Sequence, residues 1–295
     1  MMRAPFLAVL SALAVLWGCG ERNHSQPLST TETRATAMTT EVTIKLGEMG
    51  PSLAKRYPSN VKVQHQPAGL DFYEIDWDQQ SPGTVRVEHR NHSFVVEHVL
   101  GVLSSQDLED FKSEGLKEFN ISSGITEPDR IPHDEARLKT YAILKRIMDA
   151  GWKNTVDIGD PRVRGKDRLR YALLQNKYVG LDVTYVPTLE EWMQIESRTP
   201  WNFYANGLYM NVIFTRERSL TDREKPGSYL LTFNIRTDTE YFRGFAGPDN
   251  RLRWKELLPQ EIAKAAASRA QKEAELRAKG VSLDESYQDP PAPAQ

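Results

Sequence analysis

The chain has 295 residues, of which 39% are hydrophobic and 26% are charged, and its formal net charge is −2 at pH 7. The near-balance of 38 basic and 40 acidic side chains argues against nucleic acid as a partner, because nucleic-acid binders carry a clear basic excess. The hydrophobic share and the six tryptophans exclude a wholly disordered chain and predict a protein with a buried core.

The first residues have the three parts of a bacterial export signal. A positive charge at Arg3 is followed by an uncharged segment over 4–16 and by a small residue, Gly18. The uncharged segment, of about 13 residues, is too short to cross a bilayer core of roughly 30 Å as a helix. We therefore expect residues 1–18 to be a removed signal peptide.

Cys19, the only cysteine, directly follows this segment. The sequence Leu16-Trp17-Gly18-Cys19 resembles the lipobox of bacterial lipoproteins, although Trp17 stands where a small residue is usual. The resemblance implies cleavage before Cys19 and acyl chains on its thiol and amine, and several such chains anchor a protein stably in a membrane. Gly20, in place of the aspartate that retains lipoproteins in the inner membrane, implies the outer membrane, facing the periplasm. The alternative is an ordinary secretory signal with an incidental cysteine.

Four segments are expected along the chain. The sequence from Gly20 to Thr40 is rich in Ser and Thr and shows no apolar period, which is typical of a flexible tether. The expected organisation is a signal peptide at 1–18, a tether at 19–41, an α+β globular domain at 42–245, and a C-terminal helix with a disordered tail at 246–295.

Short strands are predicted in the first half of the globular domain. Residues 70–77 form an aromatic strand, and residues 84–103 contain two β-rich segments that meet near Arg90, which predicts a hairpin. In 105–119 the apolar residues recur at roughly helical spacing behind Ser105, a good N-cap. This pattern predicts a helix over 105–119.

Two helices are predicted in the middle of the chain. An apolar stripe at helical spacing follows Pro132 and is closed by Gly151, which predicts a helix between them. Further on, Thr188 and Glu191 form a capping-box pattern, which predicts the start of a short helix.

The last third is predicted to hold a second hairpin and a long helix. Residues 208–217 alternate as a strand, with 227–236 as the antiparallel partner. An alanine-rich helix is expected over 259–279, from Pro259 to a stop at Gly280, and its few apolar residues predict weak docking and projection from the body. The irregular order of elements favours an α+β fold, with antiparallel hairpins packed with two to three helices, over a doubly wound parallel sheet.

Three histidines, His89, His92 and His98, lie on or beside the first hairpin and are the densest candidate for a metal site. Side chains repeat every two residues on a strand, so His92 and His98 share a face while His89 depends on the turn. The favoured interpretation is mobile surface histidines, with no metal and no other cofactor; zinc binding is the alternative.

No catalytic residue is predicted. The sequence contains no Gly-x-Ser-x-Gly elbow and neither of the glycine-rich patterns that cradle phosphates. A non-enzymatic protein is therefore favoured, and a hydrolase that uses two carboxylates or the three histidines is the alternative.

A basic segment is the candidate interaction patch. Its members recur at every second position and would share one face of a strand, where they could meet anionic lipid heads or an acidic partner. The alternative is a solvated sheet edge whose charges prevent aggregation. The basic residues are Arg162, Arg164, Lys166, Arg168 and Arg170.

The segments PHDEARLKTYAILKRIMDAGW, DPRVRG, TLEEWMQIE and WNFYANGLYMNVIFTRER are similar to parts of bacterial lipoproteins encoded beside type VI secretion effectors, some of which are immunity proteins. The resemblance covers roughly residues 60–240. It implies a periplasmic binder, held to the membrane through lipidated Cys19, whose protein partner is a secreted toxin of the phospholipase type. The alternatives are an accessory lipoprotein of envelope assembly and a periplasmic hydrolase.

Overall fold

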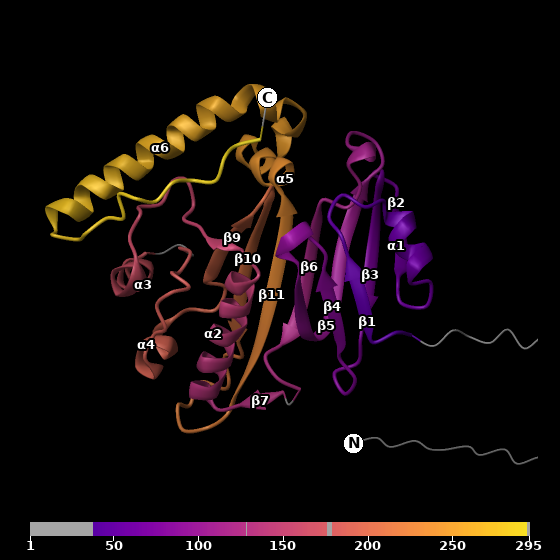
Figure 1. Cartoon of the computed structure of the whole chain (residues 1–295), viewed down its shortest axis with the longest axis horizontal. Coiled ribbons are helices and arrows are strands. Elements are labelled where there is room, and N and C mark those ends of the chain that lie inside the picture. The colour runs from indigo at the N-terminus through magenta and orange to yellow at the C-terminus, as the bar shows by residue number, and fades with distance from the viewer. Residues whose placement is uncertain (1–37, 128, 176–178, 294–295) are drawn as a thin grey trace, which may run out of the picture. The chain divides into compact units, whose positions relative to one another are not determined.

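A sheet of 11 strands forms the centre of the fold in the computed structural model (Figure 1). The structure describes residues 38–127, 129–175 and 179–293, which belong to one compact unit. Helices and hairpins follow one another irregularly along the chain, so the α+β class predicted from the sequence is confirmed.

The main path of the sheet runs β1-β4-β5-β6-β11-β10-β9-β8, and β2, β3 and β7 pair beside it. β1 pairs with β4 in parallel, and the other pairs of strands are antiparallel. The strands are β1 (Glu41–Ile44), β2 (Lys62–Gln66), β3 (Leu70–Asp76), β4 (Gly83–Val87), β5 (Phe94–Asp107), β6 (Glu118–Gly124), β7 (Arg130–Ile131), β8 (Lys153–Asn154), β9 (Pro200–Ala205), β10 (Leu208–Arg216) and β11 (Gly227–Thr237).

Six α-helices surround the sheet in the described residues. The 3-10 turns η1 (Arg90–His92), η2 (Lys112–Glu114), η3 (Gly244–Ala246) and η4 (Pro248–Arg253) connect other elements. The helices are α1 (Gly50–Arg56), α2 (His133–Asp149), α3 (Gly165–Leu174), α4 (Leu189–Gln194), α5 (Asp238–Arg243) and α6 (Trp254–Ala278).

Both predicted hairpins are confirmed. β4 and β5 pair on either side of the turn at Arg90–His92, and β10 pairs with β11 along its whole length. β5 has 14 residues and pairs with two strands along one of its edges: its first half pairs with β4 and its second half with β3. The predicted strand at 70–77 is β3, which is also confirmed.

The helix predicted over 105–119 is wrong. β5 continues to Asp107, and β6 starts at Glu118, with only the short turn η2 between them. Gly115 lies there with a φ of 65°, and a Cβ at this position would meet the backbone oxygens of Gly47 and Glu48 within 2.7 Å. The helical spacing of the apolar residues was misleading, because the two ends of this segment are strand residues: 105–107 pair with β3, and 118–119 pair with β11.

The two helices predicted in the middle of the chain are confirmed. α2 follows Pro132 and gives way at Gly151, whose φ of 90° suits glycine. α4 begins with the predicted capping box, in which the Thr188 side chain accepts from the backbone of Glu191 and the Glu191 side chain accepts from that of Thr188.

The main hydrophobic core lies on one face of the sheet, which we call the first face. α2 packs there through Tyr141, Leu144 and Ile147. The rings of Tyr141 and Trp201 meet edge to face with centroids 5.8 Å apart. The buried strand residues of this core include Phe119, Ile121, Trp201, Phe203, Met210, Val212, Phe214, Leu231, Phe233 and Ile235.

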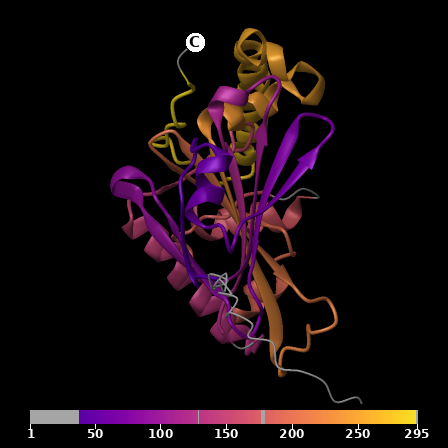
Figure 2. The same cartoon turned by 90° about the vertical axis from the view of Figure 1, so that its right-hand side faces the viewer.

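A smaller core covers one end of the opposite, second face. Tyr209 on β10 stacks on Tyr241 of α5 with ring centroids 3.8 Å apart, and Phe242 packs beside them. α6 closes this core with Trp254 and Leu258. Figures 1 and 2 both show α5 and α6 gathered at the same end of the strands.

The C-terminal helix differs from its prediction in two respects. It begins at Trp254, so Pro259 lies inside it and not at its start. It is also firmly docked, because Trp254, Leu258 and Glu273 are buried, and Asp289 of the expected disordered tail is ion-paired with Arg269. Among the described residues no helix is both long and apolar enough to cross a membrane.

Candidate functional site

The second face of the sheet carries a row of six polar side chains and one leucine that crosses seven strands. Residues directly opposite each other on antiparallel strands point to the same face, so the strand register defines the row. From β2 to β9 its members are Lys62, Glu74, Leu103, Asn120, Asn234, Asn211 and Asn202. We call these seven residues the polar row.

Amide hydrogen bonds orient the asparagines of the polar row. Asn234 donates from Nδ2 to Oδ1 of Asn120 at 2.7 Å, and Asn211 donates to Oδ1 of Asn202 at the same distance. Arg236, two residues after Asn234 on β11, donates to Oδ1 of Asn211 at 2.8 Å. Because each amide is held by its neighbour, the surface has fixed donors and acceptors before any partner binds.

Exposure to solvent varies along the polar row. Asn202 is buried and donates to Asp157 Oδ2 at 3.0 Å, and burial raises the pKa of Asp157. Towards β5 the face opens, and Leu103 is 41% exposed between Glu74 and Asn120. An exposed leucine in a frame of oriented polar groups is a composition suited to a protein interface.

A cavity of 630 Å³ lies at the edge of this open face. Ser105 and Glu118, which line it, belong to the second face beside the polar row, and Glu118 accepts a hydrogen bond from Asn234. Phe111 and Leu252 contribute apolar surface to the same cavity, and Leu252 is 68% exposed. The cavity therefore extends the open face towards η4.

An ion cluster supports the base of this cavity. The buried guanidinium of Arg243 lies 2.6 Å from Glu240 and 3.0 Å from Glu114, and it stacks on the ring of Phe111 at 3.7 Å. Lys117 lies 2.7 Å from Glu114. Burial opposes the charge on Glu240, but its cationic neighbours prevail and its pKa is lowered. The cluster holds α5, η2 and the start of β6 together.

The five basic residues of the predicted interaction patch do not lie on one strand face. Residues 165–174 form helix α3, and Arg162 and Arg164 precede it. The predicted strand is therefore wrong. Each of the five cations is ion-paired with a carboxylate of the same chain. The pairs are Arg162–Glu273, Arg164–Asp284, Lys166–Glu191, Arg168–Asp160 and Arg170–Asp167.

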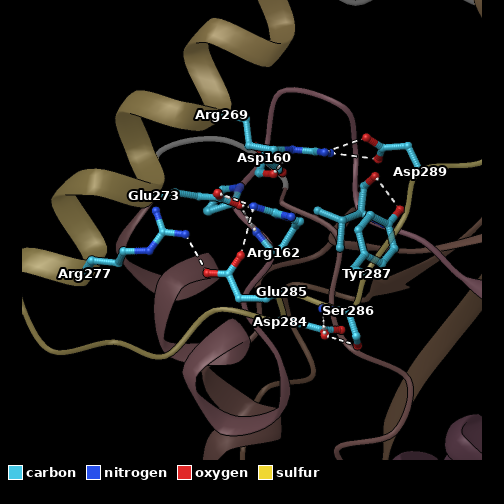
Figure 3. Close-up of polar contacts among 12 residues, drawn as sticks. Asp160, Arg162, Arg269, Glu273, Arg277, Asp284, Glu285, Ser286, Tyr287 and Asp289 are labelled. Atoms are coloured by element: carbon cyan, nitrogen blue, oxygen red, sulfur yellow. Dashed lines mark hydrogen bonds and ion pairs between the residues drawn. The ribbon is translucent and has the colours of Figure 1, made fainter.

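Arg162 and Arg164 join the C-terminal part of the chain to the loop before α3. Figure 3 shows the contacts of Arg162. Arg162 pairs with Glu273 on α6, and Arg164 pairs with Asp284 beyond it. Hydrogen bonds from Arg162 lower the pKa of Glu273. These two ion pairs hold α6 and the residues beyond it against the loop before α3.

Arg168 is the most buried of the five. Its side chain is 2% exposed, and it donates to the backbone oxygens of Gly180 and Pro161. A strand pattern read from alternation alone could not reveal this burial, since it depends on how α3 packs.

Two of the three histidines come together. The rings of His89 and His92 have centroids 5.9 Å apart, and each ring bonds a backbone oxygen, that of Ala205 for His89 and that of Ala150 for His92. Burial lowers the pKa of His89. These two rings are half-buried and held in place, so the expectation of mobile surface histidines is wrong for them.

His98 lies on β5 and lines a separate hollow with Glu97 and Thr126. Within residues 38–127, 129–175 and 179–293, no three His, Cys, Asp or Glu side chains gather in a way that could hold a metal ion. The predicted lipidation site, Cys19, lies outside the described residues.

The polar row was missed in the sequence. Asn211 and Asn234 lie in strands that were predicted correctly, and each alternates with core residues of its own strand. Period-two alternation could therefore have placed both on the second face. Their alignment with Asn120 and Asn202 depends on strand order, which the sequence does not state. No protein family matches the chain, and neither a curated protein nor a solved structure matches it.

Proposed function

We propose that this chain is a non-enzymatic, lipid-anchored binding protein of the bacterial envelope that captures a protein partner on the open part of its second face. The observation that carries the proposal is the exposure of Leu103 within the polar row. Amides fixed by their neighbours lose little freedom on binding, which favours affinity. A central apolar side chain with a polar surround is the usual anatomy of an interface.

The partner we propose is a secreted toxin of the phospholipase type, which the protein would neutralise as an immunity protein. The ground for this choice is the resemblance of four sequence segments to lipoproteins encoded beside type VI effectors. Acylated Cys19 would hold the domain at the outer membrane, on a tether of about 20 residues whose root-mean-square span is roughly 25 Å. The binding face would then meet a toxin entering the periplasm.

A competition assay tests the proposal. A strain that lacks the gene is challenged by siblings that deliver the toxin, and it is complemented with the wild-type protein, Leu103→Arg or Leu138→Arg. Leu138 is a matched control, because it is 51% exposed on α2, which covers the first face. We expect Leu138→Arg to protect as the wild type does and Leu103→Arg to protect at least about tenfold less, the effect of losing roughly 1.4 kcal/mol of binding.

Two results would contradict the proposal. One is a deletion strain that stays fully resistant to its siblings. The other is full protection by Leu103→Arg at wild-type abundance. The anchor is tested separately by labelling with a palmitate analogue, where uptake of label by Cys19→Ser would exclude lipidation at this residue.

A role in envelope assembly is the alternative. It was expected to use the C-terminal helix as a docking element, but Trp254 and Leu258 of α6 pack into the chain's own second core. Neighbouring genes distinguish the two functions, because a lipase-type gene beside this one favours immunity and biogenesis genes favour assembly.

A further inference from the structure

β2 is an edge of the sheet, because among the described strands it pairs only with β3. All five of its residues are exposed, so the strand is open to solvent on both faces. Figure 2 shows the hairpin of β2 and β3 at the margin of the molecule. A bare edge presents backbone N–H and C=O groups on which a further strand can pair.

The residues that flank β3 show which way its backbone groups point. The oxygen of Gly69 accepts from the N–H of Leu108 at 2.8 Å, and the N–H of Trp77 donates to the oxygen of Leu100 at 2.9 Å. Both bonds run towards β5. Successive residues of a strand direct their N–H and C=O groups to opposite edges. The odd-numbered residues of β3 therefore bond β5, and the even-numbered residues bond β2.

The same alternation identifies the free groups of β2. Even-numbered residues of β3 lie opposite even-numbered residues of β2, as Glu74 lies opposite Lys62. The odd-numbered residues of β2, Val63 and His65, therefore direct their N–H and C=O groups out of the sheet. In the part of the chain that the structure describes, no hydrogen bond uses these four groups.

The free edge has a defined length. On one side of it the N–H of Val61 is already used, because it donates to the oxygen of Tyr57 at 2.9 Å. On the other side Pro67 has no N–H. Val63 and His65 are thus the two donors of the edge, and they stand symmetrically about the residue between them.

We propose that β2 pairs with β2 of a second copy of this chain, antiparallel and about a two-fold axis at Gln64. Val63 of each copy then lies opposite His65 of the other copy. Each of these two pairs exchanges two hydrogen bonds, so all four free groups of each copy are satisfied. A two-fold interface requires a self-complementary surface, and the symmetric set of donors and acceptors on β2 is one.

The side chains of β2 suit this register. Lys62 lies opposite the neutral Gln66 of the other copy, and the two lysines stand about 14 Å apart along the strands. A lysine on an edge usually opposes pairing between sheets. Here its charge is matched within the hairpin, because Lys62 Nζ lies 2.9 Å from Asp76 Oδ2. The pairing therefore places no two lysines opposite each other.

The pairing joins the second faces of the two copies. The even-numbered side chains of β2 lie on the second face, since Lys62 is the outer member of the polar row. A two-fold axis perpendicular to the sheet keeps both second faces on the same side. Two edges of five residues make a small contact, of the size that is typical of transient association. We therefore expect an equilibrium between monomer and dimer.

A disulfide on the two-fold axis tests the register. Gln64→Cys is introduced into the full-length chain together with Cys19→Ser, so that it is the only thiol. The two copies of residue 64 would form a non-hydrogen-bonded pair with Cα atoms about 4.5 Å apart, which a disulfide can span. Gln66→Cys is the matched control, because Gln66 is exposed on the same face but its two copies would stand about 14 Å apart.

Mild oxidation and a non-reducing gel measure the cross-linked dimer. We expect Gln64→Cys to form at least about tenfold more of it than Gln66→Cys, because only the first pair of cysteines lies within disulfide distance. Equal cross-linking of the two variants would overturn the inference, since it would show random collision and no defined register.

The outward N–H of Val63 is tested without introduced cysteines. Val63→Pro removes this donor and leaves the bonds between β2 and β3 in place, because proline is tolerated where the N–H of an edge strand faces solvent. Val63→Thr keeps the N–H and is the control. In sedimentation equilibrium of full-length protein with Cys19→Ser, we expect the dimer dissociation constant of Val63→Pro to be at least about tenfold larger than that of Val63→Thr. Circular dichroism confirms that both variants are folded.

Two results of the sedimentation experiment would overturn the inference. One is a protein with native Val63 that stays monomeric as its concentration rises, and the other is equal dimerisation of Val63→Pro and Val63→Thr. The inference is independent of the proposed function, because dimerisation is measured without membrane or toxin and no variant changes Leu103. A monomeric protein would leave the competition assay untouched, and a failed competition assay would leave the edge of β2 untouched.

Discussion

Glu273 and Arg162 form a two-pronged ion pair across 111 residues of sequence. Glu273 Oε1 accepts from the backbone N–H of Arg162 at 3.0 Å and from its Nε at 2.8 Å, and Oε2 accepts from the terminal nitrogen at 2.8 Å. The Glu273 side chain is only 4% exposed. A helix with few apolar residues is thus fixed to the body by a buried carboxylate.

Glu273→Ala should lower the free energy of unfolding by about 3 kcal/mol, because it leaves a guanidinium and a backbone N–H without their acceptor. Chemical denaturation measures the loss. Glu275→Ala, an exposed position one half-turn along α6, is the control and should change stability by less than about 0.5 kcal/mol. Equal effects of the two substitutions would mean that the pair does not hold the helix.

Arg168→Ala and Arg170→Ala should differ sharply in how much they destabilise the protein, although both remove one positive charge from α3. Arg168 is buried beside Asp160 and bonds two backbone oxygens, so its loss should cost about 3 kcal/mol. The Arg170 side chain is 65% exposed beside Asp167, and its loss should cost less than about 0.5 kcal/mol. Thermal denaturation measures both, and similar melting temperatures would refute the assigned burial.

Stability should fall as the pH drops below about 6.5, the ordinary pKa of histidine. Burial lowers the pKa of His133, which bonds Tyr229 and the backbone oxygen of Asp222 and lies near Arg216. A lowered pKa means that the unfolded chain binds the proton more readily than the folded protein does. The stability that neutral His133 contributes is therefore fully present above pH 6.5 and is lost progressively as the pH falls below it.

The slope of unfolding free energy against pH measures this effect, with a limit of about 1.4 kcal/mol per pH unit for each histidine. His133→Gln should reduce the slope between about pH 6.5 and 5.5. His89, whose pKa burial also lowers, should contribute in the same direction, so His89→Gln/His133→Gln should flatten the curve further. An unchanged slope in the double variant would contradict the assignment.

Thr188→Ala should destabilise the protein by about 1 kcal/mol by removing the N-cap of α4. The N–H of Thr188 and the hydroxyl of Tyr185 lower the pKa of Glu191 to about 2, so its carboxylate is ionised at neutral pH. Urea denaturation measures the loss, and Thr221→Ala at an exposed loop position is the control. A loss no larger than that of the control would show that the capping box contributes nothing.

Elements whose signals are local were predictable. The capping box of α4 and the glycine that ends α2 require only neighbours in sequence, and the pairing of β10 with β11 follows from alternation on both sides of one loop. The segment 105–119 was not predictable in this way. Its apolar spacing suits a helix, and only pairing with distant strands makes its two ends part of β5 and β6.

The candidate sites show the same division. Alternation placed five basic residues in one strand, whereas each cation is paired with an acid, in two cases far along the chain, Glu273 and Asp284. The polar row needs four asparagines to be in register across β6, β11, β10 and β9. No pattern within a few residues of sequence specifies which distant residues come together.

By itself the sequence determined the α+β class, both hairpins and the helices whose caps are written in adjacent residues, because hydrogen bonds to near neighbours and periodic burial act over a few residues. The tertiary structure decided which carboxylate each basic residue pairs with, which face of the sheet stays open and where the C-terminal segment lies. Those outcomes depend on contacts between residues more than 100 positions apart, such as Arg162 and Glu273, that form only when the sheet has been assembled.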